Sequence, residues 1–243
     1  MPVLMLLSCN SVFAQTNLIV NGDFEQTTVQ SSGQWDSHYP YVNVTGWTSA
    51  GYNFLFTPGS ADTTGVYSSE NTKQLILWGP NSGSANGLPA TSPTGGNFVG
   101  MDGAYQVGAI SQVITGLHAG HTYQLNFYWA AAQQHGYTGD TTEKIKATLG
   151  SQFHTTSTIS NPSEAFSGWT EQSFDYIATG GTETLSLLAI GTPSGVPPFA
   201  LIDGVSMYDL SEVTPEPGAM ALAAAGFVGF AGAVVRRRRA ARK

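Results

Sequence analysis

Cysteine and basic side chains are scarce in this 243-residue chain. Cys9 is its one cysteine, so no disulfide can form within the chain. Only Lys73, Lys144 and Lys146 precede the basic C-terminal end, whereas all sixteen Asp and Glu residues lie at or before Glu216. Three Lys against sixteen acidic residues leave the chain before that end with a net charge of −13. This charge excludes a nucleic-acid-binding surface, because such a surface needs clustered Lys and Arg.

The common catalytic signatures are also missing. No Ser lies in a Gly-x-Ser-x-Gly pattern, and no Gly-rich loop leads into a helical pattern. The five histidines have no metal-binding spacing; they are His38, His118, His121, His135 and His154. The sixteen acidic residues offer many carboxylate pairs for glycoside hydrolysis, but no pair stands out from the others. We therefore expect that the protein is not an enzyme, and a polysaccharide-active enzyme is the second alternative.

Residues 1–14 have the pattern of a signal peptide. An apolar stretch runs from Val3 to Leu7, and Val12-Phe13-Ala14 suits cleavage by signal peptidase after Ala14. The basic residues that normally open a signal peptide are missing, so we expect the true start codon to lie upstream. Cys9 would leave with the signal peptide, and the mature protein would then contain no thiol.

The last thirty residues join a Pro-Glu-Pro linker (212–217), an uncharged apolar run (218–235) and a basic end (236–243). As a helix rising about 1.5 Å per residue, the apolar run would span roughly 27 Å, close to the hydrocarbon core of about 30 Å. The basic end would stay in the cytoplasm and leave the rest of the protein outside it. We therefore predict one C-terminal transmembrane helix. The flanking signal residues are Pro215, Glu216, Pro217, Arg236, Arg237, Arg238 and Arg239.

This three-part tail resembles the PEP-CTERM sorting signal of Gram-negative bacteria. The resemblance covers only the last thirty residues, but it includes the triplet, the apolar run and the Arg cluster in the same order. It implies that an exosortase-type membrane protease recognises the tail and cleaves it near the Pro-Glu-Pro. The protein would be anchored in the inner membrane transiently and then pass to the cell envelope, the outer surface or the extracellular matrix of a biofilm.

Residues 15–211 have the composition and the periodicity of β-strands. In "TYQLNFYWA" the side chains of Tyr123, Leu125, Phe127 and Trp129 alternate with others, as they do in a half-buried strand. Further strands are predicted at residues 109–114, 173–179, 183–190 and 199–210. Gly and Pro separate these segments at short intervals, and helical periodicity is absent. We predict one all-β domain, an antiparallel jelly-roll β-sandwich, because two packed sheets accommodate many short strands.

Two carboxylates stand at the ends of this domain. The opening strand, "NLIVNGDFE", is predicted to finish on Glu25, and the closing strand places Asp203 on the same face as Leu201, Val205 and Met207. A carboxylate on an apolar face is costly unless it is paired, hydrogen-bonded or bound to a cation. Calcium held by both carboxylates and nearby carbonyls is one solution. An Asp bonded to loop amides at the sheet edge is the other, and the spacing favours neither.

The two end motifs, with "ISQVITGLHAGHTYQLNFYWA" and "GWTEQSFDYIATGGTETLSLLAIG" between them, resemble the galactose-binding-like jelly roll. Many carbohydrate-binding modules and secreted cell-wall proteins use this fold, and the resemblance covers nearly all of residues 15–211. It implies that the first and last strands lie together and hold a structural calcium through Glu25 and Asp203. Gly204 stands where many relatives carry a second Asp, so the chain departs from the family's ligand set there.

Aromatic side chains next to amides and carboxylates favour sugar binding, because rings pack on sugar C–H groups while polar groups pair with hydroxyls. The candidate ligand-binding residues, on predicted loops, are Trp35, Tyr39, Tyr41 and Tyr137. Three other tryptophans lie in strand-like patterns and are expected in the core; they are Trp47, Trp129 and Trp169.

We therefore predict an exported protein that binds extracellular polysaccharide. The alternative is a matrix scaffold that makes protein contacts without recognising sugar. Exposed aromatic residues beside amides would favour the first function, and a large apolar patch elsewhere would favour the second.

Overall fold

The computed structural model describes residues 15–211 apart from 29–30, 36–41 and 68–73. The predicted signal peptide, Pro-Glu-Pro linker, transmembrane segment and basic end all lie outside the described residues, as do Tyr39 and Tyr41. The described residues form strands, turns and loops, and none of them belongs to a helix that could cross a membrane. One compact unit extends from Asn17 to Asp209.

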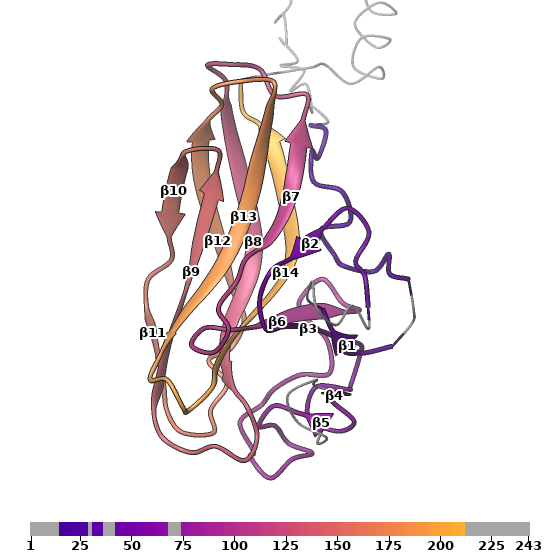
Figure 1. Cartoon of the computed structure of the whole chain (residues 1–243), viewed down its shortest axis with the longest axis vertical. Helices are drawn as coiled ribbons and strands as arrows, with labels where there is room; N and C mark the ends of the chain where they lie inside the picture. The colour runs from indigo at the N-terminus through magenta and orange to yellow at the C-terminus, as the bar shows by residue number, and fades with distance from the viewer. Residues whose placement is uncertain (1–14, 29–30, 36–41, 68–73, 212–243) are drawn as a thin grey trace, which may run out of the picture. The chain divides into compact units, whose positions relative to one another are not determined.

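Two antiparallel sheets make up most of this unit (Figure 1). The first sheet has the order β1 (Gly33–Gln34), β3 (Asn53–Phe56), β6 (Phe98–Asp102), β14 (Pro198–Asp209), β8 (Thr122–Gln133), β12 (Thr170–Ile177). The second has the order β10 (Gln152–Thr155), β9 (Thr141–Leu149), β13 (Thr182–Thr192), β7 (Ile110–Thr115), β2 (Thr48–Ser49), and β11 (Ile159–Asn161) also pairs with β9. A separate ribbon joins β4 (Val66–Tyr67) to β5 (Gln74–Leu75).

The connections between the long strands pass from one sheet to the other. The chain changes sheet between β7 and β8, between β8 and β9, between β12 and β13, and between β13 and β14. Strands that follow one another in sequence therefore face each other across the core, as in a jelly roll. The prediction of an all-β antiparallel sandwich is confirmed.

The main core lies between the two sheets. It receives the alternating inward side chains of β8, namely Tyr123, Leu125, Phe127 and Trp129, as the sequence pattern predicts. Trp47 also belongs to this core, and its indole N–H donates to the carbonyl oxygen of Asn21 at 3.0 Å. The predicted core positions of Trp47 and Trp129 are confirmed.

A second core covers the outer face of the first sheet, which explains why β14 is buried on both faces. Phe54 and Phe56 of β3 pack with Phe199 and Leu201 of β14. Trp169 is partly buried against this cluster, with its ring 5.7 Å from that of Phe98. In Figure 1 the short strands β1, β3, β4, β5 and β6 gather beside the lower half of the long strands.

The predicted opening strand is wrong. Residues 17–25 form no strand, because Asn21 (φ 52°) and Phe24 (φ 55°) adopt left-handed backbone conformations that interrupt an extended chain. The segment nevertheless runs beside β14, since the amide of Leu18 donates to the carbonyl oxygen of Met207 at 2.9 Å. A second bond joins the amide of Val205 to the carbonyl oxygen of Gly22, also at 2.9 Å.

The predicted alternation of β14 is also wrong beyond Asp203. A β-bulge between Asp203 and Ser206 shifts the register with β8, and Gly204 (φ 62°) occupies the left-handed conformation within it. Val205 and Met207 therefore point into the main core, whereas Leu201 belongs to the second core. Asp203 does not share one continuous apolar face with all three residues.

Candidate functional site

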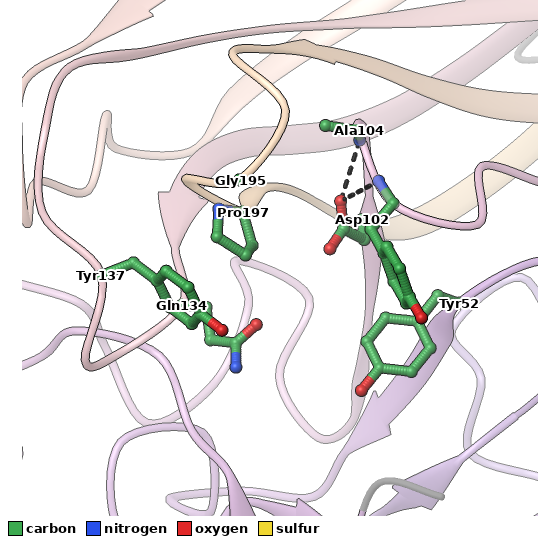
Figure 2. A pocket seen from close by; sticks show the side chains of 8 residues that line it. Tyr52, Asp102, Ala104, Gln134, Tyr137, Gly195 and Pro197 are labelled. Carbon is green, nitrogen blue, oxygen red and sulfur yellow. Dashed lines mark hydrogen bonds between the residues drawn. The ribbon is translucent and has the colours of Figure 1, made fainter. Parts of the chain in front are cut away.

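A pocket of about 260 Å³ lies where several loops meet (Figure 2). The loop after β6, the loop after β8 and the loop between β13 and β14 all contribute to it. The lining residues are Tyr52, Asp102, Ala104, Tyr105, Gln134, Tyr137, Gly195 and Pro197. The pocket therefore combines tyrosine rings with a carboxylate and an amide side chain.

Two of the three tyrosines present ring surface to solvent. Tyr105 is 44% exposed and Tyr137 is 38% exposed, whereas Tyr52 is buried. The rings of Tyr52 and Tyr105 meet edge to face, with their centroids 5.3 Å apart and an interplanar angle of 89°. This contact fixes the orientation of Tyr105, because edge-to-face pairs are the favoured arrangement of aromatic rings.

Asp102 ends β6 and is the acidic group of the pocket. Its Oδ1 accepts hydrogen bonds from the backbone amides of Ala104 (2.8 Å) and Tyr105 (2.9 Å). Its Oδ2 is buried and has no hydrogen-bond partner. Burial raises the pKa of Asp102 to about 6, although the two amide bonds lower it. Asp102 can therefore still accept a hydrogen bond through Oδ2.

Glu143 lies behind Asp102 and does not line the pocket. Its side chain on β9 is fully buried, and neither Oε1 nor Oε2 has a hydrogen-bond partner. Burial raises the pKa of Glu143 well above its usual value, and the nearby charge of Asp102 raises it further. The two carboxylates thus form an electrostatically coupled pair.

The loop that carries Gln134 and Tyr137 is held on several sides. The amide of Gln134 donates to the carbonyl oxygen of Pro197 at 3.2 Å, and the indole N–H of Trp78 donates to the carbonyl oxygen of Tyr137 at 2.7 Å. The Trp78 ring also lies 4.3 Å from the ring of His135. These contacts hold the exposed Tyr137 ring at the pocket before any ligand arrives.

The predicted ligand-binding aromatics have different positions in the structure. Tyr137 lines the pocket. Trp35 is only 2% exposed and packs in the main core, so the prediction that it contacts a ligand is wrong. Its segment joins the sheet through the pairing of β1 with β3, which turns the ring inward. Tyr39 and Tyr41 lie outside the described residues.

The sequence interpretation missed Tyr52, Asp102 and Tyr105. The stretch "MDGAY" offered a signal, since an Asp-Gly turn and an exposed aromatic follow a buried strand there. Nothing in the sequence brings this stretch next to the segment "AAQQHGYTGD", because the two come from different loops. The jelly-roll topology makes them neighbours.

Asp203 and Glu25 contact the same loop, residues 92–97. The hydroxyls of Ser92 and Thr94 donate to Asp203 Oδ2, and the backbone amide of Asn97 donates to Glu25 Oε1. Asp203 Oδ1 is buried and has no hydrogen-bond partner. Burial raises the pKa of Asp203 to about 7; the Ser92 and Thr94 bonds lower it, and the charge of Asp23 raises it.

These groups fit a hard cation in the chemistry of their donors. The unpartnered oxygen of Asp203, the Glu25 carboxylate and the two hydroxyls supply only oxygen, as calcium prefers. Within the described ranges, no group of three or more His, Cys, Asp and Glu residues is arranged to hold a metal ion. An ion at this place would therefore draw part of its ligands from hydroxyls and backbone carbonyls.

The C-terminal tail belongs to a known class of sorting signals. The family model described as the PEP-CTERM protein-sorting motif matches residues 213–239, which confirms the resemblance seen in the tail. This motif implies processing by an exosortase and export to the cell envelope or surface.

One curated relative matches the body more widely. Halomucin of Haloquadratum walsbyi (strain DSM 16790 / HBSQ001) is 27% identical over 201 residues, which is 82% of this chain. The chain spans only about 2% of the length of that relative.

Solved structures with some likeness include carbohydrate-binding modules. TmCBM61, solved in complex with beta-1,4-galactotriose, has a TM-score of 0.41 and 15% identity over 80% of this chain and 99% of its own. The CBM22-2 xylan-binding domain from Paenibacillus barcinonensis Xyn10C has a TM-score of 0.35 and 13% identity over 69% of this chain and 93% of its own. At such scores, the fold assignment rests on the strand order of the chain itself.

Proposed function

We propose that this protein is exported to the cell envelope or extracellular matrix and binds carbohydrate of an extracellular polysaccharide in the tyrosine pocket. The observation that carries the proposal is the pairing of two half-exposed rings, Tyr105 and Tyr137, with the polar groups of Asp102 and Gln134. The sorting motif supports the location, because it directs proteins to the surface on which such polymers lie.

The pocket supplies both kinds of contact that a sugar needs. The exposed faces of Tyr105 and Tyr137 pack against sugar C–H groups, while Asp102 and Gln134 pair with hydroxyls. Its volume of about 260 Å³ is below the range of roughly 300–1,000 Å³ that is usual for drug-sized ligands. The pocket is therefore suited to a single sugar residue or a chain end rather than to a long stretch of polymer.

The sorting tail supplies the route of export in this proposal. Signal peptidase removes the first residues, and the apolar run anchors the protein in the inner membrane until the exosortase-type protease cleaves the tail. The mature protein that reaches the polysaccharide then consists of the β-sandwich body.

A scaffold that makes protein contacts remains the alternative function. Phe153 of β10 is 59% exposed and Ile177 of β12 is 55% exposed. The ends of their strands are close, since the side chain of Gln152 donates to the carbonyl oxygen of Ile177 at 2.5 Å, but the Phe153 ring itself contacts the Lys146 ammonium. These two side chains are where a protein partner would bind in that alternative.

Catalysis at this pocket is disfavoured by the placement of the acids. Glycoside hydrolysis needs two carboxyl groups on opposite sides of one glycosidic bond. Asp102 lines the pocket, but its neighbour Glu143 is fully buried and does not reach the space a substrate would fill. We therefore propose binding without turnover.

We also propose a structural calcium ion at Asp203 and Glu25. The ion would neutralise the buried Asp203 and tie the N-terminal segment and β14 to the loop of residues 92–97. A chelator should then lower the melting temperature of the wild type, because a ligand that binds only the folded state stabilises it. Asp203→Ala should remove that sensitivity.

A glycan array tests the proposed function directly. The probe is the body, residues 15–211, which carries both cores. We expect binding that Tyr137→Ala weakens and that Phe153→Ala leaves unchanged, because Phe153 is exposed on a different strand. If no glycan binds, the carbohydrate proposal fails. If Phe153→Ala instead abolishes capture of a matrix protein, the scaffold alternative gains support.

A further inference from the structure

Three buried carboxylate oxygens beside the pocket have no hydrogen-bond partner: Asp102 Oδ2, Glu143 Oε1 and Glu143 Oε2. Buried polar atoms are nearly always paired, and an unpaired buried charge costs far more than an unpaired neutral group. Sugar contacts in the pocket reach at most Asp102, because only this residue of the two lines it. They leave Glu143 unexplained.

The backbone makes room for the Glu143 carboxylate but does not bond it. A Cβ on Gly191 would lie 1.7 Å from Glu143 Oε1, and one on Gly103 would lie 2.1 Å from it. The amides of both glycines are already used, because Gly191 donates to the carbonyl oxygen of Gly103 at 2.9 Å and Gly103 donates to that of Pro198 at 3.0 Å. The chain therefore brings the carboxylate against two backbone segments that offer it no donor.

No basic side chain in the described part of the chain compensates the pair. Lys144 and Lys146 lie on the same strand as Glu143, but they alternate with its inward positions and are only partly buried. The Lys146 ammonium lies over the Phe153 ring, 4.5 Å from its centroid. Two coupled carboxylates without a cation are unfavourable in a protein interior, because opposite charge is what offsets their desolvation.

We propose that Asp102 and Glu143 bind a calcium ion behind the tyrosine pocket. The three unpartnered oxygens are hard donors of the kind that calcium prefers, and the charge of the ion balances the two carboxylates. Asp102 lines the pocket, so the ion enters from solvent through the pocket and completes its coordination with water or carbonyl oxygens there. The proposal does not depend on sugar binding.

This ion is separate from the calcium proposed at Asp203 and Glu25. Asn97, which bonds Glu25, precedes β6, whereas Asp102 ends the same strand. Five residues of extended chain separate the two places, about 17 Å at roughly 3.3 Å per residue. One ion cannot serve both groups, and substitutions can remove them one at a time.

Calorimetric titration of the body with calcium chloride at pH 7.5 tests the proposal. The variants are Glu143→Gln and Asp203→Asn, and Glu171→Gln at an exposed position of β12 is the matched control. We expect a calcium-binding event that is still present in Asp203→Asn and in the control. The same event should be absent from Glu143→Gln. If Asp203→Asn removes all calcium binding, the proposal is overturned.

Three further results keep the test decisive if Glu143→Gln fails to fold. Asp102→Asn removes a negative charge at the mouth of the site, and it should abolish the same binding event. The number of calcium ions bound by the wild type is also informative. If the wild type binds one ion and Asp203→Asn binds none, there is no ion at Asp102 and Glu143. Terbium luminescence of Asp203→Asn offers a second probe, and calcium should quench its signal by displacing the lanthanide.

Discussion

The buried acids make the stability of the calcium-free protein fall as the pH rises. The pKa of Asp102 is raised from 3.8 to about 6, and that of Asp203 from 3.8 to about 7. Between these values the folded chain binds more protons than the unfolded chain, so the free energy of unfolding decreases with increasing pH. The stabilisation that protonation of these carboxyl groups provides is fully present below about pH 4 and is lost above about pH 7.

The size of the effect follows from 1.36 kcal/mol per pKa unit. Asp102 contributes about 3 kcal/mol and Asp203 about 4 kcal/mol, and Glu143 acts in the same direction. The sum is comparable with the total stability of a typical domain, about 5–15 kcal/mol. A loss of this size is easily measured.

Denaturant unfolding followed by tryptophan fluorescence at several pH values between 4 and 8 gives this dependence. In chelator, we expect the free energy of unfolding to fall across this range. In saturating calcium the decrease should vanish or reverse, because only deprotonated carboxylates bind the ion. Asp102→Asn should flatten the curve in chelator, whereas Asp175→Asn, an exposed control on β12, should not. A free energy of unfolding in chelator that is the same at pH 4.5 and pH 7.5 would refute the reasoning.

Three further predictions concern the pocket, the packing around Glu143 and the tail. Tyr105→Ala should weaken polysaccharide binding about two- to tenfold, since ring contacts contribute about 0.5–1.5 kcal/mol, and should leave the body folded. Gly191→Ala should lower the melting temperature clearly, because the added Cβ clashes with Glu143 Oε1. Gly180→Ala is the control: its added Cβ would have no atom within 4 Å, so the melting temperature should hardly change. Mass spectrometry of the mature protein should find no Arg236, and Glu216→Ala should leave the tail attached.

Strand periodicity was enough to predict the fold class and the main core. Successive side chains of β8 point alternately into the core and away from it, so Leu125 and Phe127 could be placed inward from the sequence alone. The departures lie where the backbone leaves regular geometry. The left-handed Asn21 and the bulge at Gly204 each change which way later side chains point, and no periodicity reveals them.

Only part of the pocket could be predicted from the sequence, because its residues come from segments that lie far apart in the chain. Tyr137 could be proposed because it lies in a polar loop segment rich in amides. Its partners Asp102 and Tyr105 lie at the end of β6 and in the loop after it, more than thirty residues away, and strand order alone brings these segments together. The burial of Trp35 is likewise a tertiary effect, since its own segment contains only the two-residue strand β1.

Calorimetric titration of the body with the extracellular polysaccharide of its own cell surface tests the central claim most directly. We predict saturable binding that Tyr137→Ala weakens at least fivefold and Phe153→Ala leaves within twofold of the wild type. Equal affinity of Tyr137→Ala and the wild type, or no binding by any of the three proteins, would contradict a carbohydrate site at the tyrosine pocket.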